Sequence, residues 1–272
     1  MKPNAFPHAI ITGGSSGIGK AIALKLFLQG SSLTLIGRDL LKLAQTEAEL
    51  EAHQVQPAQR LLTLSADVAD QGAIATAIET AIQQLGAPDL LILCAGIAHP
   101  GHFQALPLDI FEKTMAINYF GSLYCLKAAL PVMEQQQKGH IVLVSSGAGL
   151  VGLYGYTPYS PSKFALRGLA ESLRGELRQT GIGLSIVYPP DTDTPQLVTE
   201  NLTKPLATKR ITATAKLWSA EAVADAVLRG IHHKTFTIAP GLEMGLLNRF
   251  HSLVAPLIHW YCDRLVTKTL NS

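Results

Sequence analysis

Short apolar runs alternate with longer amphipathic stretches along most of the chain. Residues 90–93, 141–144 and 184–187 consist of Leu, Ile and Val, apart from Ser185. Such runs are typical of parallel strands that are buried on both faces. Further strands are predicted near residues 8, 32, 61 and 235, with helices between successive strands. The pattern predicts an α/β fold with a doubly wound, parallel, seven-stranded sheet of the Rossmann type and helices on both faces.

In a doubly wound sheet, ligands bind beyond the carboxyl ends of the strands. Gly13, Cys94, Ser146 and Pro189 each follow a predicted strand. We therefore expect these four residues to meet in one crevice, which is the expected binding site.

Composition limits the classes of protein that fit this pattern. The chain has 272 residues, of which 47% are hydrophobic and 15% charged, and no linker or repeat interrupts residues 1–240, which suits one large domain. A net charge of +2 without a basic cluster gives no support for nucleic-acid binding. Three widely spaced cysteines indicate a reducing compartment and suggest neither a disulfide framework nor a metal site. No signal peptide precedes the first strand, so we expect a cytoplasmic location.

A glycine-rich turn joins the first predicted strand to the first predicted helix. Glycines at such a turn let the amide groups of the helix N-terminus approach a pyrophosphate, which the helix dipole also favours. A turn of this kind can be purely structural, but the order of strand, glycine turn and helix favours dinucleotide binding. The candidate cofactor-binding residues here are Gly13, Ser15, Ser16, Gly17, Ile18 and Gly19.

The end of the second strand indicates which dinucleotide binds. Gly37 stands where an acidic residue would bind the ribose hydroxyls of NAD, and Arg38 follows it. A guanidinium suits a 2′-phosphate, and Ser15 could add a hydroxyl donor. The sequence therefore predicts NADPH, although Arg38 could instead be a solvated arginine at the start of the next helix.

Ser146, Tyr159 and Lys163 form the candidate catalytic set. A spacing of four places Tyr159 and Lys163 on one face of a helix, where the ammonium is expected to lower the pKa of the phenol. With Thr157 as N-cap and Pro158 as first helical residue, Pro161 falls in the first turn, where its missing amide costs nothing. An ordinary surface pair on a helix is the alternative, and the neighbouring motifs argue against it.

At these residues the chain resembles the short-chain dehydrogenase/reductase family. The resemblance rests on Thr12-Gly13-x-x-x-Gly17-x-Gly19 and on Ser146, Tyr159 and Lys163 in the expected order, and it spans about residues 8–240. It implies an NADP-binding reductase domain over residues 1–240 and a homo-oligomer that pairs through residues 111–133 and 164–177. Asn118 matches a fourth catalytic position, which organises a water near the lysine.

The resemblance also assigns further cofactor contacts. Cys94 departs from the family pattern, which has Asn-Ala-Gly at this strand end, so the usual polar clamp is expected to be weaker. The cofactor-binding residues that the resemblance adds are Asp67, Val68, Cys94, Ala95, Gly96, Tyr159, Lys163, Pro189, Thr192 and Thr194.

A narrower resemblance lies in residues 188–195, Tyr-Pro-Pro-Asp-Thr-Asp-Thr-Pro, followed by Glu200-Asn201 and Lys204-Pro205. It is similar to the branch of the family that reduces 3-ketodihydrosphingosine, a long-chain 2-amino ketone of sphingolipid synthesis. The alternatives are a reductase for another bulky ketone, such as a steroid or a 3-oxoacyl group, and a non-catalytic NADPH-binding regulator. Asp191 or Asp193 could pair with the substrate ammonium, or both could cap backbone amides.

Two segments stand outside this motif pattern. Residues 191–218 are rich in Thr, Pro and Lys with little periodicity, which predicts a mobile loop that acts as a substrate lid, or else an irregular surface segment. Residues 241–272 form an apolar C-terminal extension that charged residues interrupt too often for a membrane span. It is expected either to pack on the protein or to lie at a membrane surface, with a lipid-like ketone as the substrate.

Overall fold

The computed structural model describes residues 6–213 and 216–270, and its central element is a parallel sheet. Seven strands are hydrogen-bonded in the order β3-β2-β1-β4-β5-β6-β9, and every pair is parallel. This confirms the predicted doubly wound, seven-stranded fold. The strands of this sheet are β1 (His8–Thr12), β2 (Ser32–Gly37), β3 (Leu61–Ser65), β4 (Leu90–Leu93), β5 (Gly139–Val144), β6 (Ile182–Val187) and β9 (Thr237–Ile238).

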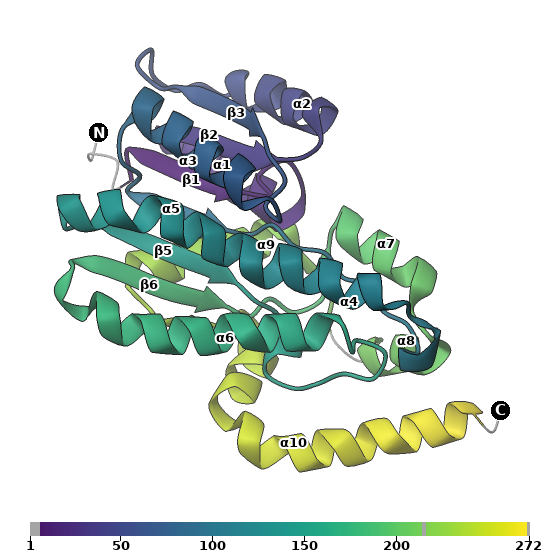
Figure 1. Cartoon of the computed structure of the whole chain (residues 1–272). Coiled ribbons are helices and arrows are strands. Elements are labelled where there is room, and N and C mark those ends of the chain that lie inside the picture. The colour runs from purple at the N-terminus through teal and green to yellow at the C-terminus, as the bar shows by residue number, and fades with distance from the viewer. Residues whose placement is uncertain (1–5, 214–215, 271–272) are drawn as a thin grey trace.

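Helices cover both faces of the sheet, as Figure 1 shows. The α-helices are α1 (Gly17–Leu28), α2 (Leu40–Glu51), α3 (Gln71–Leu85), α4 (Leu108–Met115), α5 (Gly121–Gln136), α6 (Tyr159–Glu176), α7 (Pro195–Thr203), α8 (Leu206–Thr212), α9 (Ala220–His232) and α10 (Gly241–Leu270). Short turns are η1 (Phe103–Ala105), η2 (Ala116–Phe120), η3 (Gly147–Gly149) and η4 (Leu177–Gln179), of which η2 is a π-helical turn.

Two apolar cores lie on opposite faces of the sheet. On one face, Ile22 of α1 and Val227 of α9 are fully buried against the strands. On the other face, Ile78 of α3, Leu126 of α5 and Leu166 of α6 are buried in the second core. Because both faces are covered, the central strands need apolar side chains at successive positions, which explains the continuous runs in the sequence.

The order of the strands determines where a ligand can bind. The chain passes from β1 outward to β2 and β3, then returns to β4 on the other side of β1. The connections therefore diverge at the carboxyl ends of β1 and β4, and a crevice opens at such a switch point.

The segment between residues 191 and 218 is more regular than the sequence suggested. It contains α7 and α8, and its ends pair as β7 (Thr192–Asp193) and β8 (Trp218–Ser219). The expectation of a loop without regular structure was wrong, because helices as short as α7 and α8 show little periodicity. The start of α7 was readable: Thr194 is its N-cap, accepting a hydrogen bond from Leu197 N at 3.4 Å, and Pro195 is its first residue.

The C-terminal extension is a helix, α10, that bends at Phe250 and then runs beside α8. Before the bend, Met244 is buried in the core, where its side chain lies beside Gly147 of η3. Farther along, an Arg210 side-chain nitrogen donates a hydrogen bond to Thr269 Oγ1 at 2.9 Å. Over the described residues, no helix combines the length and the hydrophobicity that a membrane crossing requires.

Candidate active site

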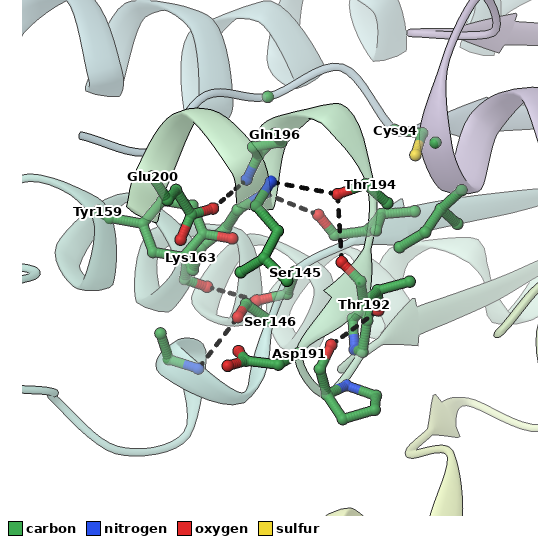
Figure 2. A pocket seen from close by; sticks show the side chains of 18 of the residues that line it. Cys94, Ser145, Ser146, Tyr159, Lys163, Asp191, Thr192, Thr194, Gln196 and Glu200 are labelled. Carbon is green, nitrogen blue, oxygen red and sulfur yellow. Dashed lines mark hydrogen bonds between the residues drawn. The ribbon is translucent and has the colours of Figure 1, made fainter. Parts of the chain in front are cut away.

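The carboxyl ends of β1, β4, β5 and β6 open into one cleft, which Figure 2 shows from close by. The predicted site residues that line it are Gly13, Ser16, Gly17, Ile18, Cys94, Ala95, Gly96, Ser146, Tyr159, Lys163, Pro189, Thr192 and Thr194. The predicted residues that do not line it are Ser15, Gly19, Arg38, Asp67, Val68 and Asn118. Strand ends that are far apart in the sequence thus supply one continuous cavity.

One side of the cleft, here called the strand-end wall (Gly13, Gly17 and residues 94–96), is built from closely packed main chain. Gly13 and Gly17 have φ values of +68° and +51°, a region that favours glycine. A Cβ atom at Gly13 would lie 3.0 Å from the Ala95 main chain, and one at Gly17 would lie 3.0 Å from Thr194 Cγ2. The side chain of Ser16, the N-cap residue of α1, does not cap the helix, so its first amide groups remain available. This wall fits the pyrophosphate of a dinucleotide.

The end of β2 brings together the residues that the sequence predicts to select the cofactor. The Ser15 hydroxyl lies 3.3 Å from where a Gly37 Cβ would be. Arg38 and Asp67 are about half exposed, with 3.4 Å between an Arg38 side-chain nitrogen and an Asp67 carboxylate oxygen. Arg38 also directly precedes Asp39, the N-cap of α2, so it lies at the start of the next helix as well. The guanidinium is accessible, and no acidic residue stands at position 37.

The end of β4 is attached to β1 through a hydroxyl group. Thr12 Oγ1 accepts hydrogen bonds from Cys94 N at 3.2 Å and from Ala95 N at 3.3 Å. This clamp uses the main chain of Cys94, so it is independent of the Cys side chain that departs from the family pattern. Burial raises the pKa of the Cys94 thiol to about 11, which keeps it neutral at ordinary pH.

Asn118 occupies the π-helical turn between α4 and α5 and is fully buried. Its Oδ1 accepts from Ile97 N at 2.8 Å, while its Nδ2 donates to Ile97 O and to Ser162 Oγ, each at 2.9 Å. A Cβ at Gly96 would lie 3.2 Å from Asn118 Oδ1 and 3.4 Å from Lys163 Nζ. Asn118 therefore connects the β4 end to α6 close to Lys163, and π-helical turns often occur at functional sites.

Tyr159 and Lys163 both project into the cleft from the first turns of α6. The helix begins at Tyr159, and Pro158 is its flanking residue without a side-chain cap. The predicted start with Thr157 as N-cap was therefore one residue early. Pro161 still falls in the first turn, where its missing amide hydrogen breaks no hydrogen bond.

Lys163 is buried beside Tyr159. Its Nζ donates a hydrogen bond to Val144 O at 3.0 Å and lies 5.5 Å from the centre of the Tyr159 ring. Burial lowers the pKa of Lys163 to about 8. The ammonium is thus charged at neutral pH and becomes neutral within a mildly alkaline range.

The pKa of Tyr159 is raised, whereas the sequence predicted that Lys163 would lower it. Burial raises the pKa of the phenol above its usual value, and the carboxylates of Glu200 and Asp191 raise it further. Hydrogen bonds with Ser146 and Gln196 act in the opposite direction. The sequence pattern placed the lysine correctly, but it gave no sign that two acidic groups would lie near the same phenol. Tyr159 is consequently protonated and able to donate a hydrogen.

The opposite side of the cleft, here called the α7 wall (Tyr156, Asp191, Gln196 and Glu200), is built from side chains. The Tyr156 hydroxyl donates to Glu200 Oε2 at 2.7 Å, and Gln196 Nε2 donates to Glu200 Oε1 at 2.9 Å. Lys204 is buried and its Nζ lies 3.9 Å from Glu200 Oε2. The Tyr156 and Tyr159 rings are 5.7 Å apart between centroids, so this network borders the phenol directly.

Sequence reasoning missed Tyr156 and Gln196 as lining residues, and it used Glu200 and Lys204 only as part of a resemblance. One signal was present, because Gln196, Glu200 and Lys204 follow each other at intervals of four. Such a spacing usually indicates a solvated helix face with salt bridges. In the folded protein this helix face points into the cleft instead of into solvent. The packing of α7 against the loop before α6 causes this, and the sequence alone does not reveal it.

Comparison with known families agrees with this geometry. The family described as short chain dehydrogenase matches residues 7–205. Over 259 residues the chain is 41% identical to the 3-ketodihydrosphingosine reductase of Bos taurus, covering 94% of this chain and 78% of the bovine protein. It is 42% identical to the 3-dehydrosphinganine reductase of Danio rerio, covering 92% and 76% of the two chains. With the 3-ketodihydrosphingosine reductase of Dictyostelium discoideum the identity is 40%, with 92% and 83% covered.

Two solved structures share the fold. A short chain dehydrogenase/reductase from Burkholderia phymatum, determined in complex with NAD, has a TM-score of 0.80 at 24% identity and covers 93% of this chain and 96% of its own. Levodione reductase has a TM-score of 0.78 at 23% identity and covers 88% and 97%. At these identities the similarity concerns the fold alone.

Proposed function

Because this chain belongs to the short chain dehydrogenase family, we propose that it reduces 3-ketodihydrosphingosine to dihydrosphingosine with NADPH. One observation carries the proposal: Ser146, Tyr159 and Lys163 line the same cavity as the glycine turn of α1. The proposed proton donor, the proposed hydrogen-bond donor and the residues that would hold the dinucleotide therefore line one crevice. The reductase names of relatives at about 41% identity supply the substrate.

The residues of the strand-end wall fit a dinucleotide, and those beside β2 favour its phosphorylated form. The amide groups of the first turn of α1 would hold the pyrophosphate, and Arg38 with Ser15 would hold the 2′-phosphate. Asp67 and Val68 would border the adenine, Thr194 would contact the nicotinamide amide, and Lys163 would reach the adjoining ribose. When bound, NADPH supplies the hydride that the carbonyl carbon accepts.

The protein's own groups handle the proton and the developing charge. Tyr159, kept protonated by its buried position, donates its proton to the carbonyl oxygen. Ser146 donates a hydrogen bond to the same oxygen as it becomes an alkoxide. Lys163 stabilises the phenolate that Tyr159 leaves behind, and Asn118 fixes the turn against which Lys163 packs. Each group acts on a charge that appears only as the reaction proceeds.

An absorbance assay of NADPH consumption tests the proposal. The panel contains 3-ketodihydrosphingosine, a steroid ketone and a 3-oxoacyl thioester, with NADH as the alternative reductant. We expect kcat/KM with NADPH to be highest for 3-ketodihydrosphingosine. A clear preference for the steroid or the thioester would refute the substrate assignment, and binding of NADPH without turnover of any ketone would support a regulator instead.

We propose that α7 and α8 form the lid over the substrate. Leu197 and Thr212 line the cleft from these helices, while Val198, Leu202 and Leu206 are exposed on the outside. A lid with apolar residues on both surfaces suits a long alkyl chain that passes from a lipid phase into the cleft. Limited proteolysis tests this, since NADPH and substrate together should protect residues 195–212 more than NADPH does alone.

We also propose that the protein is cytoplasmic and binds a membrane surface through α10. Leu242, Leu253, Leu257 and Trp260 expose between 56% and 80% of their surface along this helix. An Arg264 guanidinium stacks 4.5 Å from the Trp260 ring, and this combination of cation and indole suits a lipid headgroup region. Co-sedimentation with anionic vesicles should fall when Leu253 and Leu257 are both replaced by Glu, and unchanged binding would refute the proposal.

The proposed homo-oligomer uses the outer surface of α4, α5 and α6. Phe120 and Phe164 are about 40% exposed on this side of the molecule. Apolar side chains of this size favour burial between subunits. Light scattering should give a mass above one chain, and Phe120→Asp with Phe164→Asp should reduce it to that of a monomer; a wild-type monomer would refute the proposal.

A further inference from the structure

Three carboxylates follow β6, and the structure distinguishes them. Asp193 is exposed and does not line the cleft, whereas Asp191 and Glu200 both do. The substrate of the proposed reaction carries an ammonium on the carbon next to its ketone. A carboxylate near Tyr159 is the type of group that would bind this ammonium. Asp193 is excluded by its position.

Glu200 already has its partners. The Tyr156 hydroxyl and Gln196 Nε2 each donate to one of its oxygens, and Lys204 Nζ lies 3.9 Å away. A carboxylate held in this way is satisfied in a buried environment. Its function is to fix the α7 wall in place.

Asp191 is in the opposite situation. Its carboxylate is half-buried in the cleft and makes no hydrogen bond or ion pair with any residue in the described part of the chain. Its main chain is held firmly, because Asp191 O accepts a hydrogen bond from Trp218 N at 2.9 Å. Burial raises the pKa of this carboxyl, the charge of Lys204 lowers it in part, and the charge of Glu200 raises it again. The pKa remains above its ordinary value, so a further cation at bonding distance would stabilise the ionised form.

Asp191 is also close to the reacting groups. Gly147 N donates to Pro189 O at 3.2 Å, which holds the loop that carries Asp191 against the residue after Ser146. The charge of Asp191 acts on the Tyr159 hydroxyl, as that of Glu200 does. In Figure 2, Asp191 is drawn among the side chains that line the pocket with Ser146 and Glu200.

Two cations lie near these carboxylates, and neither makes an ion pair with Asp191. Lys204 Nζ lies 3.9 Å from Glu200 Oε2. Lys163 lines the same cleft, where its Nζ donates a hydrogen bond to Val144 O at 3.0 Å. A substrate ammonium would supply the charged hydrogen bond that the half-buried Asp191 carboxylate lacks.

We propose that the Asp191 carboxylate binds the ammonium group beside the substrate ketone and thereby selects 2-amino ketones over plain ketones. This inference rests on the proposed function. The ammonium is fixed one carbon from the carbonyl, so the ion pair also orients the carbonyl oxygen toward Tyr159 and Ser146. Asp191 is thus a specificity-determining residue, whereas Glu200, Gln196 and Tyr156 position the wall.

The experiment compares two substrates in the full-length protein. They are 3-ketodihydrosphingosine and the same long-chain ketone without its amino group. For Asp191→Asn we expect kcat/KM for the amino ketone to fall about 10- to 100-fold, the range for a lost charged hydrogen bond, with less than about a threefold change for the plain ketone. Asp191→Glu should restore part of the preference, and Asp193→Asn, two residues away and exposed, should leave both values unchanged.

The results distinguish a failure of this inference from a failure of the proposed function. If wild-type protein prefers the amino ketone but Asp191→Asn slows both ketones equally, or neither, the inference is overturned while the proposed function stands. If the wild-type protein reduces the amino ketone no better than the plain one, the proposed function is overturned and the inference with it. Melting temperature and NADPH affinity of each variant identify a loss caused by misfolding, and a preference that Asp191→Glu does not restore also counts against the inference.

Discussion

The strand-end wall of the cleft is made of main chain, whereas the α7 wall is made of interlocking side chains. Gly13 and Gly17 allow close contact because they lack a Cβ, and their amide groups are the atoms proposed to bind the dinucleotide. Tyr156, Gln196 and Glu200 instead bind one another through their side chains. Main-chain atoms are the same in every enzyme of the fold, so a wall made of them suits a shared ligand such as the dinucleotide. Side chains differ from one enzyme to another, so a wall made of them can be specific to one substrate.

The largest effect is expected at Tyr159, where the two walls meet. Tyr159→Phe removes the proton donor and should lower kcat about 1000-fold, within the range for a general acid, while the Kd for NADPH changes less than about twofold. Tyr154→Phe is the matched control, because Tyr154 is a half-buried tyrosine of the preceding loop whose hydroxyl hydrogen-bonds His102 and which does not line the cleft. Near-normal turnover by Tyr159→Phe would show that another group donates the proton.

The next largest effect is expected on the free energy of unfolding, when the buried cation beside the α7 wall is removed. Lys204→Met removes the buried cation next to Glu200 and should reduce the free energy of unfolding by about 3 kcal/mol, the low end for breaking a buried pair, since Tyr156 and Gln196 remain. Lys20→Met removes a partly exposed partner of Glu49 and should cost less than about 1 kcal/mol. Urea unfolding of both variants measures the difference. Equal losses would mean that the wall does not depend on its cation.

A smaller effect should separate the cofactors at the end of β2. Gly37→Asp places a carboxylate beside Ser15 and Arg38, where it would repel a 2′-phosphate and pair with ribose hydroxyls. We expect kcat/KM for NADPH to fall on the order of 10-fold and that for NADH to rise. Steady-state kinetics with the two nucleotides and one ketone measure the ratio. If NADPH remains equally preferred, Arg38 is not its selecting residue.

The smallest effect is a pH dependence at Lys163. Its pKa of about 8 means that the ammonium is charged below this pH and neutral above it. A charged Lys163 stabilises the Tyr159 phenolate, so kcat/KM for reduction should be constant below about pH 8 and fall up to about tenfold per pH unit above it. Lys163→Arg, which stays charged, should move this decline to higher pH. An identical profile in both proteins would assign the decline to another group.

The sequence indicated the candidate catalytic residues and much of the fold from local patterns. Apolar runs located the strands, and the glycine turn and the Tyr159 and Lys163 spacing placed their residues in one cleft. It gave the wrong sign for the Tyr159 pKa, because Glu200 and Asp191 are distant in sequence and approach the phenol only after folding. It also missed the helices of residues 191–218, which are too short for a clear periodicity.

Local chemistry was therefore sufficient wherever a property depends on neighbours along the chain: the positive φ of a glycine, the spacing of two side chains on a helix, and the burial of an uninterrupted apolar strand. Tertiary structure alone decided which carboxylate is hydrogen-bonded and which makes no hydrogen bond or ion pair with the residues that the structure describes. Asp191 and Glu200 look alike in the sequence, but it is Glu200 that accepts the Tyr156 hydroxyl hydrogen bond and pairs with Lys204 when α7 packs against the loop before α6. Electrostatic interactions depend on distance in space and on burial, and neither can be obtained from the order of residues.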